Sequence, residues 1–325
     1  MPNHIITKII VMETYLCLDF GGTKLLIGEV DSSGNILRYK KYDTGYFNQE
    51  AAAELMKRAV ADYVNTCGWY CNQKPVAMGV GLIGRVNTTD GVWMQIDPSR
   101  NTPIPLARQL SEAYGIPCHI DNDVKSATRA ERLWGFGSIS NNFIFINVGT
   151  GLAAGFVVNG RQIRGAHFNA GEIGHSFVGA GNGVRCGCGR TDCAETIVSG
   201  IGFDRSAHAL KGKYKTSLNI PDNDTDRVSV AEIYALYQKG DELCTVLVDR
   251  AAQALADLIM NLVRFTDPDT VVLGGGIVAS GFLYEKVLSR LNPTTMRFVT
   301  NGVVLTKLNP NFIGLVGAAA VAMDK

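Results

Sequence analysis

The sequence predicts an α/β protein built from two related halves that face each other across a cleft. An apolar strand, a glycine turn and a second strand occur in that order twice, in residues 16–30 and in residues 144–164. Apolar residues at helical spacing follow each copy, over 49–66 and over 229–265. A chain of 325 residues is long enough for two domains with a core in each.

The first half is predicted to open with a meander of three strands in a mixed sheet. Residues 15–18 are apolar (YLCL), and turn residues separate them from two further strands at 25–30 and 36–42. The pattern then predicts a helix over 49–66, a buried strand over 76–82, a helix over 104–113, a strand over 117–120 and a helix over 124–134.

The second half begins with the strand 143–148, and Asn159-Gly160 is a strong hairpin signal between strands at 156–158 and 162–164. After a cysteine-containing loop, residues 229–265 are predicted to be mainly helical. The remaining segments are predicted as a strand over 270–273, a helix at about 281–290, a strand over 303–308 and an alanine-rich helix over 314–323 that packs closely against glycine-bearing backbone.

Charge and composition exclude several classes of partner. With 31 basic and 30 acidic residues, nothing indicates nucleic acid or an acidic membrane surface. No apolar run is long enough to span a bilayer, and residues 1–12 lack the cleavage site of a signal peptide. The eight cysteines do not suggest a disulfide framework in a chain of this size, so we expect a cytoplasmic protein.

The loop 171–195 carries a set of residues typical of a structural zinc site. One histidine and three closely spaced cysteines supply the nitrogen and sulfur ligands of a closed tetrahedral site: His175, Cys186, Cys188 and Cys193. The alternative is a group of buried free thiols beside a core histidine. Glu172 and Glu195 bracket the set, and because zinc prefers the softer ligands, these carboxylates remain for another task.

Two glycine turns, each directly after an apolar strand, predict a clamp for a polyphosphate. In the first, Asp19-Phe-Gly-Gly-Thr-Lys24, backbone N–H groups at Gly21 and Gly22, the Thr23 hydroxyl and the Lys24 charge can meet a phosphate. Asp19 can hold a metal–phosphate complex, and the second turn is Gly149-Thr150-Gly151. An ordinary hairpin turn is the alternative for either turn taken singly.

Two further segments combine a strand end with chemistry-bearing residues. Gly274-Gly275-Gly276 can let the backbone lie against a nucleoside, or can be a tight strand-to-helix connection. Asp121-Asn122-Asp123 stands between a strand and a helix, so these residues can be a helix N-cap or can supply a base for a substrate hydroxyl. One residue is enough for the cap, which leaves the others for chemistry.

In order along the chain, DFGGTK, the GTG turn, IDND, GEIGH, CGCGRTDC and VLGGGIV resemble the ROK family, of the actin/hexokinase-like superfamily with its ribonuclease H-like fold. The resemblance runs from about residue 14 to 322. It implies a two-lobed α/β fold, with mixed sheets flanked by helices and a cleft between the lobes. We expect one lobe over 13–123, completed by a helix at 313–325, and a second lobe over 124–312 that carries the zinc loop.

The resemblance also implies an activity and a set of roles. The activity is ATP- and Mg²⁺-dependent phosphorylation of a hexose or N-acylhexosamine hydroxyl, usually O6, with Asp123 as general base. Asn122, Glu172, His175 and Glu195 become sugar contacts, and His175 binds zinc through its other ring nitrogen beside the three cysteines. Residues at the nucleotide are Asp19, Gly21, Gly22, Thr23, Lys24, Gly149, Thr150, Gly151, Gly274 and Gly275.

The particular sugar is left open by the sequence. Gly84 and Arg85 resemble the sugar-adjacent pair of N-acetylmannosamine kinases, whereas the segment QIDPSRNTPIP departs from the family pattern, with Asp97 or Asn101 as a sugar contact. Candidates are an N-acetylmannosamine kinase or a glucokinase, followed by a fructokinase and by a sugar-sensing relative without turnover. About fourteen residues precede the first strand, too few for the DNA-binding domain of the family's repressors, and a homodimer is expected by resemblance.

Overall fold

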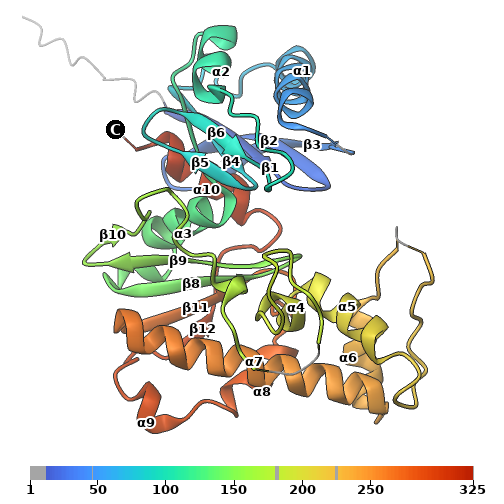
Figure 1. The fold of residues 1–325 in the computed structure, drawn as a ribbon. Helices are drawn as coiled ribbons and strands as arrows, with labels where there is room; N and C mark the ends of the chain where they lie inside the picture. The colour runs from blue at the N-terminus through green and yellow to red at the C-terminus, as the bar shows by residue number, and fades with distance from the viewer. Residues whose placement is uncertain (1–11, 46, 180–182, 224–225, 325) are drawn as a thin grey trace, which may run out of the picture. The chain divides into compact units, whose positions relative to one another are not determined.

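The computed structural model describes residues 12–45, 47–179, 183–223 and 226–324 (Figure 1). The N-terminal stretch in which we expect no signal peptide lies largely outside this range. The chain divides into two compact units, Met1–Ala130 with Ile313–Lys325, and Glu131–Phe312. Within the described ranges, no helix has both the length and the apolar character needed to cross a membrane.

The first unit is built on a mixed five-stranded sheet in the order β3-β2-β1-β4-β7. The predicted meander is confirmed, because β1, β2 and β3 pair antiparallel, whereas β4 and β7 add in parallel. Its strands are β1 (Thr14–Phe20), β2 (Lys24–Asp31), β3 (Ile36–Asp43), β4 (Ala77–Leu82) and β7 (Cys118–Asn122). A separate two-stranded sheet, β5 (Arg85–Asn87) and β6 (Val92–Gln95), follows the end of β4.

Helices cover both faces of this sheet (Figure 1). On one face, α1 (Gln49–Cys67) and α2 (Leu106–Tyr114) share an apolar core with the even-numbered side chains of β1. The side chain of Asn48 caps α1 by accepting a hydrogen bond of 2.8 Å from the Ala51 N–H. On the other face lies α10 (Ile313–Ala322), beside the first turns of α3 (Asp123–Trp134).

Helix α10 approaches the sheet so closely that glycine is required in β4. A Cβ on Gly79 would lie 1.8 Å from the Ala318 carbonyl oxygen, and one on Gly317 would lie 2.6 Å from the Ser126 carbonyl carbon of α3. The predicted packing of the alanine-rich helix against glycine-bearing backbone is therefore confirmed. Small residues let three backbones meet without gaps, as a close-packed interior requires.

The second unit repeats the strand arrangement of the first. Its sheet has the order β10-β9-β8-β11-β12, in which β8, β9 and β10 are antiparallel and β11 and β12 add in parallel. The strands are β8 (Phe143–Val148), β9 (Leu152–Val158), β10 (Arg161–Gln162), β11 (Thr270–Gly274) and β12 (Val303–Leu305). Asn159 and Gly160 both have positive φ, 50° and 72°, as the predicted hairpin turn demands.

The core of the second unit is organised around α7 (Glu242–Thr266), one face of which is buried against the sheet and neighbouring helices. Asp241 caps α7 by accepting from the Cys244 N–H at 3.0 Å. The other helical segments are η1 (Phe136–Ser138), η2 (Ile173–His175), α4 (Glu195–Val198), α5 (Gly200–Leu210), α6 (Val230–Gln238), α8 (Phe282–Leu288) and α9 (Pro293–Met296).

Candidate active site and metal centre

The four residues predicted to bind zinc are brought together in the second unit. One ligand atom from each of His175, Cys186, Cys188 and Cys193 lies within 4.8 Å of the other three. The Nδ1 atom of His175 is 3.3 Å from Cys186 Sγ, and the sulfurs of Cys188 and Cys193 are 3.6 Å apart. Sulfurs about 2.3 Å from a tetrahedral zinc are about 3.8 Å apart, so the donor set and its spacing fit this ion.

Two of these thiols differ in how readily they ionise. Burial, followed by the neighbouring thiols, raises the pKa of Cys193 to about 12. A hydrogen bond from the Arg190 backbone lowers the pKa of the exposed Cys188. Three thiolates at this spacing repel one another, and a divalent ion bound between them is the charge that offsets the repulsion.

The metal cluster adjoins the second glycine turn through Glu195, the first residue of α4. Glu195 follows Cys193 by two positions, and its Oε2 accepts a hydrogen bond of 3.0 Å from the Leu152 N–H, directly after the turn. A Cβ on Gly151 would lie 2.9 Å from that oxygen. The predicted sugar contact Glu195 and the predicted phosphate turn thus lie side by side.

Glu172 and His175 lie at the two ends of one short turn. Glu172 immediately precedes η2, and its carbonyl oxygen accepts a hydrogen bond of 3.2 Å from the His175 N–H. Because Nδ1 of His175 faces the sulfurs, Nε2 points to the opposite side of the ring. A metal bound at Nδ1 would therefore fix the orientation of a ring whose second nitrogen faces away from the cluster.

The turn Gly149-Thr150-Gly151 is held at the start of α5. The carbonyl oxygens of Gly149 and Thr150 accept hydrogen bonds of 2.9 and 3.2 Å from the N–H groups of Gly200 and Ile201, and Gly149 N–H donates to the Gly151 carbonyl at 3.0 Å. These bonds fix the backbone of the turn, as a site that binds phosphate through N–H groups requires.

The triple glycine after β11 is explained by chain packing at two of its three positions. A Cβ on Gly274 would lie 2.8 Å from the Phe145 ring, and one on Gly275, whose φ is 92°, would lie 2.4 Å from the Val148 carbonyl oxygen. At Gly276 an added Cβ would meet no atom within 4 Å. The segment is therefore a tight connection at Gly274 and Gly275, whereas Gly276 faces open space.

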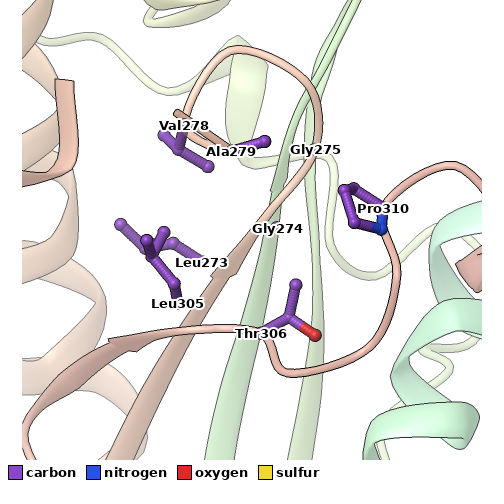
Figure 2. Close-up of a pocket in the computed structure, with 8 residues that line it drawn as sticks. All are labelled: Leu273, Gly274, Gly275, Val278, Ala279, Leu305, Thr306 and Pro310. Carbon is purple, nitrogen blue, oxygen red and sulfur yellow. The ribbon is translucent and has the colours of Figure 1, made fainter. Parts of the chain in front are cut away.

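Two pockets lie in this part of the second unit, and the turn lines the smaller one. The smaller one, about 80 Å³, lies between the turn and the end of β12, and its lining includes Leu273, Leu305, Thr306 and Pro310 (Figure 2). The larger one, about 440 Å³, lies between α6 and the start of α8 and includes Tyr234 and Phe282.

Contacts through Ile277 link a residue of the larger pocket to the predicted phosphate turn. The Tyr234 hydroxyl donates a hydrogen bond of 2.9 Å to the Ile277 carbonyl, and the ring centroids of Tyr234 and Phe282 are 4.7 Å apart. A Cβ on Gly200, which bonds the Gly149–Gly151 turn, would lie 3.8 Å from Ile277 Cδ1. Sequence reasoning missed both aromatic residues, because each sits in a helix as an ordinary apolar position.

In the first unit the glycine turn joins β1 to β2. The Gly21 N–H donates to the Lys24 carbonyl at 2.9 Å, and the Thr44 N–H donates to the Thr23 carbonyl at 3.4 Å. A Cβ on Gly22 would meet no atom within 4 Å, so this position is open to a ligand.

Asp19, at the end of β1, lies at the start of α10. A Cβ on Gly314 would come within 2.4 Å of its carboxylate. Burial raises the pKa of Asp19 to about 6, and the charge of Lys24 opposes this shift. A nearby cation would stabilise the ionised carboxylate. Asn147 occupies the matching position in β8, one residue before the strand ends; alignment of LDFGGTK with INVGTGL is the sequence signal that identifies it.

The residues of the Asp121-Asn122-Asp123 segment have separate environments. Asp121 is buried and forms an ion pair with Arg129, whose Nε lies 3.3 Å from Asp121 Oδ2. Asn122 is the helix cap: its Oδ1 accepts from the N–H groups of Val124 and Lys125 at 3.1 and 3.2 Å, and its Nδ2 donates to the Gly84 carbonyl at 3.0 Å. Asp123 is the first residue of α3, where the helix dipole favours a negative charge.

The predicted sugar loop is held by local bonds. Gly84 has a φ of 84°, and a Cβ there would lie 2.1 Å from the Gln95 carbonyl oxygen. Arg85 donates from Nη2 to Gln95 Oε1 at 3.3 Å, while its buried Nε makes no hydrogen bond among the described residues. A donor in this state is available to a ligand oxygen.

Asp97 and Asn101, the two alternatives for a sugar contact, differ in their surroundings. The Asp97 carboxylate accepts hydrogen bonds from Ser99 and Arg100, which lower its pKa to about 2. Asn101 is exposed, and its Nδ2 donates to the Pro98 carbonyl at 3.1 Å. Asp97 therefore holds the loop together, and Asn101 lies at its surface.

Comparison with known proteins identifies the family. A profile of the ROK family matches residues 15–325. A glucokinase from Streptomyces coelicolor is 31% identical over 329 residues, which cover 94% of this chain and 96% of its own. An N-acetylmannosamine kinase from Haemophilus influenzae is 31% identical over 274 residues, covering 82% of each chain.

A solved structure supports the same assignment. The ROK family glucokinase from Streptomyces griseus, in complex with glucose and AMPPNP, matches with a TM-score of 0.74 at 25% identity, covering 95% of this chain and 99% of that one. Two related mixed sheets, each with a glycine turn after its first strand, define the actin/hexokinase-like fold class, as predicted. The chain belongs to the ROK family, and the predicted enzyme class, a sugar kinase, is confirmed.

Proposed function

We propose that the protein transfers the γ-phosphoryl group of ATP to a hydroxyl of a hexose or N-acylhexosamine, at O6, with Asp123 as the general base. The observation that carries this proposal is the repeated glycine turn. Each unit presents one after its first buried strand, with Asp19 before one turn and Asn147 before the other. Phosphoryl transfer needs positioning and charge neutralisation more than covalent chemistry, and such turns supply both.

The phosphates of ATP are proposed to bind at the turns Gly21–Lys24 and Gly149–Gly151. Mg²⁺, when bound with ATP, supplies charge neutralisation at the phosphates, and Asp19 is the carboxylate proposed to hold the complex. The start of α5 fixes the second turn, and the contacts through Gly200 and Ile277 lead from it to the aromatic pocket. We place the nucleoside beside Gly274 and Gly275 on that side, against Tyr234 and Phe282.

Three residues of the second unit are proposed as sugar contacts. Glu172, His175 and Glu195 belong to the second unit, and the hydrogen bond between Glu195 and Leu152 puts that carboxylate next to the phosphate turn. Carboxylates are strong acceptors for sugar hydroxyls. Zinc bound to the four ligands would act at one remove, by fixing the turns that carry these three residues.

On the first unit, Gly84, Arg85, Asn101 and Asn122 are proposed around the sugar. Asn122 ties the Gly84 carbonyl to the start of α3, so the loop and the proposed base share one anchor. The Nε of Arg85, which has no hydrogen-bond partner in the described part of the chain, is the donor proposed for a substrate oxygen. The two relatives described above are named for glucose and N-acetylmannosamine, and these are the first two candidate substrates, followed by fructose.

The variant Asp123→Asn tests the base assignment. The amide keeps the shape of the side chain but cannot accept the hydroxyl proton, so turnover should fall by about 10²- to 10⁴-fold while sugar binding changes little. Coupled kinase assays and calorimetric titration with the sugar measure the two quantities. Asp90→Asn, an exposed carboxylate in the same unit, is the control. Wild-type turnover in the Asp123 variant would show that another group is the base.

A further inference from the structure

Two ion pairs that share Arg129 connect the β7–α3 junction with the segment that follows α10. Arg129 of α3 is 8% exposed, and Asp121 of β7 is 1% exposed. The guanidinium lies between two carboxylates: its Nε is 3.3 Å from Asp121 Oδ2, and its Nη1 contacts Asp324 Oδ2. All three residues belong to the first unit.

The contact with Asp121 alone does not fix the orientation of the Arg129 guanidinium. Although Nε of Arg129 is within ion-pair distance of Asp121, it is buried and forms no properly oriented hydrogen bond within the part of the chain that the structure describes. The fork of arginine binds firmly where two donors meet acceptors in the right geometry. Asp324 supplies the second anchor of this side chain.

The paired residues Asp121 and Arg129 lie on either side of the proposed base, Asp123, in the sequence. Asp121 precedes Asp123 by two residues, and its Oδ1 accepts a hydrogen bond of 2.8 Å from the Asn122 N–H. Arg129 follows on the same helix that begins with Asp123. Contact between Gly317 and Ser126 presses α10 against α3, so the segment after α10 lies where Asp324 can hold Arg129.

We propose that Arg129 and Asp324 are positioning residues for Asp123, which fix the strand-to-helix junction carrying the base from the side of α10. This inference rests on the proposed role of Asp123. In this proposal both residues act through the junction and not on the substrate itself. A displacement of a catalytic group by a fraction of an ångström lowers the rate of transfer with little effect on ground-state binding. The signature is therefore a fall in kcat at nearly constant KM.

The test compares two half-exposed aspartates of the first unit. Asp324→Asn removes one ion pair whose carboxylate side chain is 51% exposed, and Asp62→Asn removes the Lys40 pair, whose carboxylate is 45% exposed. We expect Asp324→Asn to lower kcat about 3- to 10-fold, with KM for sugar and ATP within about twofold. The Asp62 variant should lose a similar amount of thermal stability and keep its kcat.

A conservative change at Arg129 completes a double-mutant cycle with Asp324→Asn. Replacing Arg129 with an apolar residue would remove the ion pair of the buried Asp121, and misfolding alone would then explain a loss of activity. Arg129→Lys keeps the charge but cannot span both carboxylates. It should lower kcat as Asp324→Asn does, and the double variant should lose little more, because the two residues act through one contact. Independent, multiplying effects would overturn the proposal, as would an unchanged kcat in Asp324→Asn.

A second measurement separates this inference from the proposed function. The ¹³C resonance of the Asp123 carboxyl group, assigned by its loss in Asp123→Asn, should shift in Asp324→Asn and stay fixed in Asp62→Asn. A fixed resonance in both variants would overturn the positioning role, even in a protein that phosphorylated no sugar. Failure of the proposed function shows instead as absence of sugar-dependent turnover in the wild-type protein.

Discussion

The side chains of Asp121, Asn122 and Asp123 are neighbours in sequence, yet local chemistry divides them between structural roles and the proposed catalytic role. Asp121 is buried, and desolvation raises its pKa to about 6 against the opposing charge of Arg129. Asn122 uses its oxygen for the helix cap, and its nitrogen donates to the Gly84 carbonyl. The first position of α3 is left for a carboxylate in the field of the helix dipole.

The four clustered side chains His175, Cys186, Cys188 and Cys193 predict that the protein contains zinc. Protein purified without chelator should contain about one zinc per chain, and Cys193→Ser should lose it, because a buried hydroxyl is a poor ligand for this ion. Elemental analysis measures the metal, and thermal unfolding should show a lower Tm in the same variant. The matched control is Cys67→Ser, a partly exposed cysteine outside the cluster, which should keep both. Full activity in protein free of zinc would contradict the positioning role of the loop.

Residue types and spacing predicted that His175 and three cysteines would come together, but they did not predict the tertiary contacts of other residues. Cys186, Cys188 and Cys193 are close in sequence, so their meeting follows from a short loop. The choice between Asp97 and Asn101 depended on hydrogen bonds to Ser99 and Arg100, which no sequence pattern shows. Tyr234 and Asp324 meet their partners only through tertiary packing.

At the scale of elements, the packing of helix α10 against strand β4 depends on a single glycine. The alanine-rich sequence predicts close packing, and the structure supplies its extent, a distance of 1.8 Å between an added Cβ on Gly79 and a carbonyl oxygen of the helix. Since that oxygen belongs to backbone, it cannot move aside as a flexible side chain would. Two elements are therefore fixed relative to each other by the absence of one methyl group.

Gly79→Ala is expected to destabilise the protein by at least about 2 kcal/mol, since overpacking here must displace a helix. Denaturant unfolding measures the loss of free energy. Gly276→Ala serves as control, because a Cβ at that position meets no atom within 4 Å and should change stability little. Equal stabilities of the two variants would show that α10 is not packed as described.

Element boundaries followed from the sequence where the pattern was long and regular. The helix expected over 49–66 is α1 (Gln49–Cys67), and the strand expected over 76–82 is β4 (Ala77–Leu82). The strand expected over 303–308 ends earlier, at Leu305, and the Thr306 side chain after it donates to Glu131. The sheet of β5 and β6 and the helix α5 were not predicted, since short segments rich in glycine or polar residues carry little periodicity.

At the scale of the whole molecule, the repeated sheet order explains why one chain carries two glycine turns. Both sheets place an antiparallel hairpin at the first buried strand and add two parallel strands on its other side. The turn therefore occurs at the same topological position in each unit. This duplication was visible in the sequence as two strand–turn–strand patterns. The identity of the sugar was not visible, because side chains that hydrogen-bond hydroxyl groups can serve many hexoses.

The central claim is that this chain phosphorylates a sugar, and a coupled assay of ADP release tests it most directly. Zinc-replete protein with Mg²⁺ and ATP is offered glucose, N-acetylmannosamine, N-acetylglucosamine, mannose, fructose and allose. At least one hexose or N-acylhexosamine should give sugar-dependent ADP release that is lost in Asp123→Asn, and the 6-deoxy analogue of that sugar should give none. Binding of a sugar without turnover of any would contradict the account and indicate a sensor.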